Sequence, residues 1–202
     1  YGFDVTASDA AIKIQNADRI TVANCSASQA VFGVYLVNTD GCELHDLSVH
    51  HNQKGLLMFN ASESTIWGSQ VHNNTYFGIE MGHASMNNTI ADCHIADNGN
   101  YGVYIVQDST GNRFLHNNFI GNTAYDACGN QWGSTYGQAL GNYWSIHGGV
   151  DDFKGPSQNR SGQDGFLDSP YTVPGDSGSM DMYPLRYPIV DPPRFVWVSH
   201  AF

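Results

Sequence analysis

Positively charged residues are scarce in this chain of 202 residues. Lys and Arg together number 8, against 19 Asp and Glu, and charged residues of all kinds make up only 13%. Proteins that bind nucleic acid through its phosphates need clustered Lys and Arg. The net charge of -11 therefore predicts that nucleic acid is not a partner.

Long apolar runs are also missing from the sequence. No stretch approaches the roughly 20 apolar residues that cross a bilayer, so no membrane-spanning segment is predicted. The chain begins at Tyr1 with neither an initiator Met nor a signal peptide, which indicates a processed chain or an excised fragment.

Glycine and asparagine are frequent in this chain, although charged residues are scarce. The chain holds 22 Gly, and Asn often comes in pairs such as Asn73-Asn74 and Asn117-Asn118. Both residues favour turns, because they tolerate backbone conformations that other residues avoid. A helical protein would instead be rich in Ala, Leu, Glu and Lys. The composition therefore predicts a chain that turns often and stacks its backbone.

An internal repeat organises residues 1–130. Five segments begin with a small residue, continue with alternating apolar residues, and start 22, 22, 23 and 24 residues apart. Alternation of this kind marks a strand with one buried face. The starts are Ala11, Gly33, Gly55, Gly78 and Gly102, and a weaker sixth start is Asp126.

Aligned on these starts, the repeats place apolar residues in four inward columns, two on a first strand and two on a second. The first-strand columns are Ile12, Val34, Leu56, Ile79 and Val103, and Ile14, Leu36, Met58, Met81 and Ile105. The second-strand columns are Val22, Leu44, Ile66, Ile90 and Phe114, and Ala27, Val49, Val71, Ile95 and Phe119. A polar turn follows, and its stacked side chains can hydrogen-bond along the axis; it contains Asn52, Asn74, Asn98 and Asn122.

Short strands that recur every 22 to 24 residues predict an all-β fold, a parallel β-helix in which each coil stacks on the next. Crossovers between parallel strands make such a helix right-handed. A leucine-rich repeat needs a Leu/Asn consensus that is absent, and a helical repeat needs about 34 residues with a period of 3.6.

Past residue 130 the period fails, and aromatic residues and Gly dominate. The open end of a stacked helix exposes an unpaired edge and an apolar interior, which favours aggregation. Residues 131–190 are therefore expected to form a loop-rich cap. Residues 191–202 alternate apolar with mixed residues after Pro192-Pro193, and are expected to form a tail strand or a linker.

The four cysteines show no metal-ligand spacing such as C-x-x-C. Cys25 and Cys93 fall in one inward column three rungs apart, about 14 Å at 4.8 Å per rung. A disulfide needs Cα atoms within about 7 Å, and Cys42 lies in a different column. Cys25, Cys42 and Cys93 are therefore expected to be reduced and buried, which leaves Cys128 as the cysteine to be exposed.

Three segments of the expected cap carry a family resemblance: residues 141–145 (GNYWS), 164–171 (DGFLDSPY) and 181–185 (DMYPL). Together with the repeats, they resemble NosD-like proteins. Those proteins carry the carbohydrate-binding and sugar-hydrolase (CASH) β-helix repeat that is common in surface proteins of methanogenic archaea. The resemblance covers residues 11–185 and implies a right-handed parallel β-helix at the cell surface.

The resemblance also implies a calcium loop, for which Asp152, Asp164 and Asp168 are the candidate ligands; it implies no required cofactor. Ser161-Gly162-Gln163 stands where the family places further acidic residues. Family members include surface-layer and adhesin-like proteins, polysaccharide-acting enzymes and a periplasmic factor for copper-site maturation. The resemblance therefore predicts the fold more closely than the function.

A polar patch is expected on the outward positions of the second strand. Because rungs lie about 4.8 Å apart, Asp92 and His116 should be near neighbours. The patch offers an acid/base pair, a metal site or a sugar contact, or it is a solvated face. Coils of 22 to 24 residues leave no room for groove-building loops, which favours a solvated face with splayed side chains. The patch residues are Asp46, His50, His72, Asp92, His94 and His116.

Outward aromatic residues form a second candidate surface. Tyr35 and Tyr104 share an outward column with Leu57, and Phe59 lies close by. Such side chains can stack on sugar rings, or they can form a subunit contact, which the sequence slightly favours. Five N-glycosylation sequons are compatible with an extracellular location; they begin at Asn24, Asn60, Asn73, Asn87 and Asn159.

Three functions follow from these features. The leading hypothesis is a non-catalytic structural or adhesive module of a cell-surface layer, sheath or adhesin. Its partners would be other copies of itself, surface-layer proteins or polysaccharide. The alternative is a carbohydrate-active enzyme or a polysaccharide-binding β-helix. A weaker alternative is a periplasmic copper-site maturation factor, for which the nine His are the only support.

Overall fold

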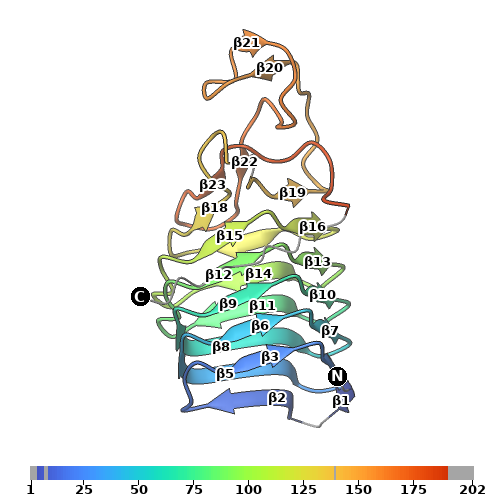
Figure 1. Ribbon diagram of the computed structural model, residues 1–202, viewed down its shortest axis with the longest axis vertical. Coiled ribbons are helices and arrows are strands. Elements are labelled where there is room, and N and C mark those ends of the chain that lie inside the picture. Colours follow the sequence, from blue (N-terminus) through green and yellow to red (C-terminus); the bar gives the residue numbers. More distant parts are fainter. Residues whose placement is uncertain (1–3, 7–8, 139, 191–202) are drawn as a thin grey trace, which may run out of the picture.

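The computed structural model of the protein describes residues 4–6, 9–138 and 140–190. Figure 1 shows a column of stacked coils with a loop-rich segment at one end. Within the described ranges the regular secondary structure is entirely β-strand, and no helix there could cross a membrane. The expected tail strand at 191–202 lies outside the described residues.

Each coil contributes one strand to each of three sheets, which are called sheets A, B and C below. Sheet B has six parallel strands: β2 (Ala10–Gln15), β5 (Phe32–Asp40), β8 (Lys54–Ser62), β11 (Phe77–Gly82), β14 (Tyr101–Ile105) and β17 (Ala124–Asp126). Sheet A holds β1 (Asp4–Thr6), β4 (Ser26–Ser28), β7 (Ser48–His50), β10 (Gln70–His72), β13 (His94–Ala96), β16 (Asn118–Ile120) and β19 (Tyr143–Trp144).

Sheet C begins with β3 (Thr21–Ala23), β6 (Glu43–His45), β9 (Thr65–Trp67), β12 (Thr89–Ala91) and β15 (Arg113–Leu115), all parallel. It continues into the C-terminal segment with β18 (Gln131–Trp132), β23 (Met180–Asp181) and the antiparallel β22 (Tyr171–Thr172). A separate hairpin pairs β20 (Phe153–Lys154) with β21 (Arg160–Ser161). The prediction of an all-β parallel helix is confirmed, and two of its three sheets extend beyond residue 130.

The predicted second strand of each coil is in fact two strands of three residues, one in sheet C and one in sheet A. Between them one residue adopts a left-handed backbone conformation, with φ of 52° to 59°, and turns the chain. Asn and Asp tolerate this conformation better than most residues, and Gly adopts it freely. This turn is called the A–C corner; its residues are Asn24, Asp46, Gly68, Asp92 and His116.

The inward columns lie as predicted. Val34, Leu56, Ile79 and Val103 are 0 to 1% exposed, and the neighbouring column is equally buried. Ile12 is only partly buried, because it belongs to the first coil. The sixth coil is offset from its prediction, since Val103 pairs with Ala124 and the coil starts three residues before Asp126.

Buried asparagine ladders hold the turns of the helix together. In the predicted ladder, Asn74 Oδ1 accepts hydrogen bonds from both the backbone N–H and the Nδ2 of Asn52, at 3.0 and 3.1 Å. Asn74 in turn donates to Asn98, and Asn98 donates to Asn122. Gly55 packs against this ladder, where a Cβ would lie 2.7 Å from Asn74 Nδ2. This contact explains the small residue that opens each repeat.

Two further ladders were not predicted. Asn88, Asn112 and Asn130 form one, and Asn117 and Asn142 form the other. They lie at the start of sheet C strands and of sheet A strands, so each bend of the coil has its own ladder. Every rung joins a side-chain amide to the next coil, which satisfies backbone groups that the turns leave without sheet partners.

Two buried aspartates end these ladders at the C-terminal side. Asp126 Oδ2 accepts hydrogen bonds from the Asn130 amide and from Trp132 Nε1, at 2.8 and 3.0 Å. Asp181 Oδ2 accepts from both nitrogens of Asn142 and from Trp144 Nε1. The indoles of Trp132 and Trp144 also stack on Phe114 and Phe119, which end the two second-strand columns, with ring centroids 4.1 and 4.0 Å apart. The segment after residue 130 therefore closes the apolar interior.

Three of the four cysteines behave as predicted, and the fourth, Cys128, is half-buried where exposure was expected. Cys25, Cys42 and Cys93 are free and buried, and Cys128 is free and half-buried. Burial raises the pKa of the Cys93 thiol to about 12. This thiol is therefore protonated at neutral pH and is a poor nucleophile.

The ladder makes a testable contribution to stability. Replacing Asn74 with Ala removes the acceptor of the Asn52 amide and the donor to the Val49 carbonyl. We expect a loss of roughly 2–4 kcal/mol, because each buried group left unpaired costs about 1–3 kcal/mol. Urea unfolding measures it, and the exposed neighbour Thr75→Ala is the control, with a change below about 0.5 kcal/mol. Equal stabilities of the two variants would contradict the ladder's role.

Stability should also depend on the ionisation of Asp126. Burial raises the pKa of this carboxyl, but hydrogen bonds from Trp132, Cys128, Asn130 and Ser179 outweigh burial and hold the pKa below its usual 3.8. A lowered folded-state pKa stabilises the protein above the unfolded value, and the stabilisation is lost as pH falls through the folded value.

In thermal melts between pH 2 and 7, Asp126→Asn should be destabilised most at neutral pH, by roughly 1.5–3 kcal/mol. The gap to the wild type should narrow below about pH 4. A gap that stays constant over this range would show that the charge of Asp126 does not contribute.

Candidate functional site

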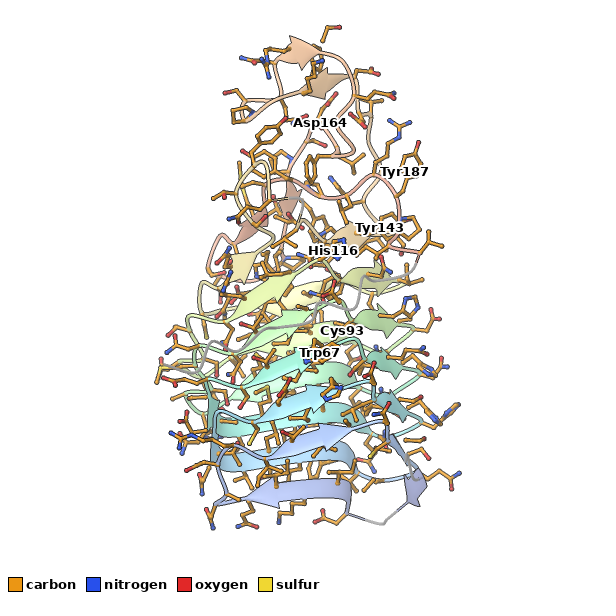
Figure 2. The ribbon with its side chains drawn as sticks, in the orientation of Figure 1. Trp67, Cys93, His116, Tyr143, Asp164 and Tyr187 are labelled. Carbon is orange, nitrogen blue, oxygen red and sulfur yellow. The ribbon has the colours of Figure 1, made fainter. Side chains whose placement is uncertain are left out.

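The predicted proximity of Asp92 and His116 is confirmed at the A–C corner. His116 lies one coil above Asp92, and its Nδ1 is 2.6 Å from Asp92 Oδ1. The side chain of Asp92 is 8% exposed, and that of His116 is 17% exposed. Figure 2 shows His116 on the coil next to the C-terminal segment. A carboxylate that accepts a hydrogen bond from Nδ1–H fixes the orientation of the imidazole ring. Nε2 is then left to act toward solvent or a ligand.

Two hollows flank this corner. One, of about 420 Å³, lies on the outer side of sheet C, and its lining includes Glu43, Arg113, Leu115 and Leu140. The other, of about 370 Å³, lies on the side of sheet A, between Gln70 and His94 and the segment ending in Ile189 and Val190. Asp92 and His116 line both hollows. Gly68, the A–C corner residue of the preceding coil, also lines the second hollow. It has no side chain to fill the space.

The expectation that this surface is open and splayed is therefore wrong for Asp92 and His116. The walls come from Leu140, Ile189 and Val190, which follow the coils in sequence and fold back over them. Asn118 holds this return segment with two 2.9 Å hydrogen bonds to the backbone of Ile189. Long loops within the coils are not needed to form a hollow here.

The chemistry of the corner is limited by what surrounds the pair. His116 has the geometry of an oriented general base. Cys93, which follows Asp92, points to the interior, where its Sγ lies 3.2 Å from the Ala91 carbonyl oxygen. With a pKa of about 12, it does not supply a nucleophile to His116.

Three other residues of the predicted patch, Asp46, His50 and His72, lie apart from this pair. Asp46 is at the A–C corner two coils earlier, and its Oδ2 lies 2.9 Å from Nδ1 of His45. His50 and His72 end adjacent sheet A strands, and their rings stack at 5.2 Å. His94 is exposed at the start of its strand and lines the second hollow together with Asp92 and His116. The structure therefore brings three of the six residues together and leaves the other three apart.

A residue missed by the sequence analysis lies beside His50. His51 Nδ1 is 2.8 Å from His50 Nδ1. His51 occupies the bend between sheets A and B, called the A–B corner, with φ of 55°. This position follows the strand, so reading only the outward strand residues does not reveal it. Burial and the neighbouring His50, His51 and His94 lower the pKa of His72.

An aromatic face covers the outside of sheet B. Tyr35, Leu57 and Tyr104 share an outward column, as predicted, and Tyr125 continues it. Phe77 stacks on Tyr104 at 4.7 Å and 6°, and Tyr104 stacks on Tyr125 at 5.2 Å and 27°. The aromatic face comprises Phe32, Tyr35, Phe77, Tyr101, Tyr104 and Tyr125.

Few free charges interrupt the aromatic face. Lys54 lies between Phe32 and Phe77, with its Nζ 5.9 and 5.8 Å from their ring centroids. Its charge is balanced by Glu80, at 2.6 Å. The Asp176 carboxylate raises the pKa of Tyr125, which therefore stays neutral. The face is rich in rings, with Lys13 over Tyr35 at one end, 5.5 Å from its ring centroid, and Asp176 beside Tyr125 at the other.

The expected calcium ligands do not gather into one site. Asp164 Oδ2 accepts hydrogen bonds from the Gly155 amide and Gln158, and Asp168 accepts from the Asp152 and Phe153 amides. These carboxylates organise the turns of the C-terminal segment, and Asp164 lies far from the coils (Figure 2). In the part of the chain that the structure describes, no three His, Cys, Asp or Glu are placed to hold a metal ion.

The five sequon asparagines share one feature, which is an exposed side chain. This is compatible with glycosylation, which stays a prediction. They are Asn24, Asn60, Asn73, Asn87 and Asn159.

Comparison with known proteins places this geometry in a family. No curated protein matches the sequence. Among solved structures, an alginate lyase from Paenibacillus sp. str. FPU-7 is similar, with 15% identity over 72% of each chain and a TM-score of 0.48. That similarity is too distant to bear on function. The family model described as "Periplasmic copper-binding protein (NosD)" matches residues 2–149. Because the match spans most of the chain, the protein belongs to the NosD family.

Proposed function

We propose that this protein is a non-catalytic adhesive module that binds polysaccharide outside the cytoplasm through the aromatic face of sheet B. The observation that carries the proposal is the stack of Phe77, Tyr104 and Tyr125 on three successive coils. Aromatic rings bind the apolar faces of sugar rings, while their hydroxyl groups bond to sugar hydroxyls. A polymer that lies along the axis would meet one of these rings on each of the three coils.

The charge of the protein favours an uncharged polysaccharide. The net charge of -11 repels acidic polymers at low ionic strength. Lys54 does not offset this on the aromatic face, because Glu80 neutralises it. Neutral glycans, such as glucans or mannans, are therefore the expected ligands.

Rigidity supports binding by this face. Each outward ring is attached to a strand whose inward neighbours are fully buried, such as Val103 and Ile105 beside Tyr104. A preformed surface loses little conformational entropy when it binds. The face therefore suits an adhesive role at the cell surface, with the cell-surface location itself part of the proposal.

Copper binding is the second candidate function, and one observation favours it. The family description names copper, and the side chains of His50, His51 and His72 lie together on two adjacent coils. Imidazole nitrogen is a common copper ligand. Of the five methionines, Met58 and Met81 are buried in the core.

Tyr104→Ala tests the primary proposal. The variant should bind a soluble neutral polysaccharide about two- to tenfold more weakly in affinity electrophoresis, reflecting the roughly 0.5–1.5 kcal/mol of an aromatic stacking contact. Tyr187→Ala removes an exposed ring of the C-terminal segment and is the control. Phe77→Ala should act like Tyr104→Ala, because the two rings stack.

Two results would contradict the proposal. One is unchanged binding in Tyr104→Ala, or an equal loss in Tyr187→Ala. The other is a concentration-dependent dimer in sedimentation that Tyr104→Ala dissociates, which would assign the aromatic face to a subunit contact.

A further inference from the structure

Two columns of residues on three successive coils frame the second hollow, the one on the side of sheet A. One column belongs to the A–C corner, and the other starts the strands β10, β13 and β16, which pair in register. At about 4.8 Å per coil, the frame is roughly 10 Å long. The corner column is Gly68, Asp92 and His116, and the strand column is Gln70, His94 and Asn118.

The coil side of this hollow is polar. His116 Nδ1 lies 2.6 Å from Asp92 Oδ1. With Nδ1 as the donor to this carboxylate, the neutral ring presents Nε2 as an acceptor. The amide of Gln70 and the ring of His94 can each donate and accept hydrogen bonds, and both residues are exposed. A ligand in the hollow therefore meets hydrogen-bonding groups of both kinds.

The opposite side of the hollow is apolar, since Ile189 and Val190 form it. This wall is held in place, because Asn118 makes two 2.9 Å hydrogen bonds to the backbone of Ile189. A sugar ring has matching sides, with hydroxyl groups around its edge and C–H groups on its faces. A polar wall that faces an apolar wall therefore suits such a ring.

Charge and size narrow the class of ligand. Asp92 is the only carboxylate among the described lining residues, and no Lys or Arg is among them. Together with the net charge of -11, this disfavours an anionic ligand. The volume of about 370 Å³ lies at the lower end of the range of about 300–1,000 Å³ that is usual for small-molecule sites. A small, uncharged ligand rich in hydroxyl groups fits both limits.

We propose that this hollow binds one sugar ring, either free or at the end of a neutral glycan chain. The sugar hydroxyl groups would bond to His116, His94 and Gln70, and a C–H face of the ring would lie against Ile189. The inference rests on the proposed function for its ligand class, a neutral sugar. Its site is made of other residues than the aromatic face of sheet B.

Gly68 keeps the hollow open. At equivalent corners Asn24 and Asp46 carry side chains with φ of 54° and 52°, and Gly68 has φ of 59°. A Cβ on Gly68 would lie 3.4 Å from Asp46 Oδ1, which is ordinary van der Waals contact. The corner therefore accepts Asn at residue 68, and the Asn side chain would occupy the hollow.

The test titrates the full chain with methyl glucoside and with methyl mannoside, followed by NMR chemical shifts. Gly68→Asn should weaken binding of at least one glycoside about tenfold or more, because its side chain displaces the ligand. His94→Ala should weaken the same binding by up to about tenfold, as expected for the loss of one hydrogen bond to the ligand. Thermal melting checks that both variants fold.

Asp46→Asn is the matched control. Asp46 occupies the same corner position two coils before Asp92, and it does not line the hollow. This variant should bind the glycosides as tightly as the wild type does.

Three results would overturn the proposal. The first is wild-type affinity in Gly68→Asn or in His94→Ala, and the second is a wild type that binds neither glycoside. The third is tighter binding of glucuronate than of methyl glucoside, which would contradict the neutral ligand class. Polymer binding by Tyr104→Ala is a separate measurement on sheet B, so the failure of one site is distinguishable from the failure of the other.

Discussion

A bend in a stacked coil leaves backbone N–H and C=O groups without sheet partners, and the rest of this structure depends on how those groups are satisfied. Buried asparagines do this, since Asn74 bonds at once to the coil before it and the coil after it. A buried amide that lost these partners would cost about 1–3 kcal/mol per group. Each ladder therefore helps to fix the register of the coils.

A fixed register makes the outer surface a lattice. Side chains at equivalent positions lie about 4.8 Å apart along the axis, so a residue type that recurs in sequence becomes a continuous surface. Recurring aromatic residues produce the aromatic face, as Tyr104 and Tyr125 show. Recurring polar residues produce pairs such as Asp92–His116 and the stacked rings of His50 and His72. Candidate functions thus arise from stacking, without catalytic loops.

The sequence predicted the parts of this lattice that follow the repeat. Columns such as Leu56 and Ile79 are visible because the period aligns them, and the same alignment brings Asp92 beside His116. The two-strand structure of the second half of the coil was missed, although the signal was present. Val22 and Ala27 both point inward but are five residues apart, and a straight strand with a period of two cannot place an odd spacing on one face.

The repeat could not predict the environment of the A–C corner. Leu140 and Ile189, which wall its hollows, are distant in sequence and belong to no column. The resemblance that suggested calcium at Asp164 and Asp168 likewise did not indicate that backbone amides would engage these carboxylates. Irregular segments follow local hydrogen bonding, which has no periodic signature.

Hydrogen exchange of the corner amides tests the central claim most directly. The backbone N–H groups of Asn52, Asn74 and Asn98 donate to side chains of the next coil and not to a strand. If the ladders fix the register, these amides should exchange only on global unfolding, as slowly as those of core strand residues such as Met58. Exchange at the faster rates of local opening, as in surface loops, would show that the sheets alone hold the coils together.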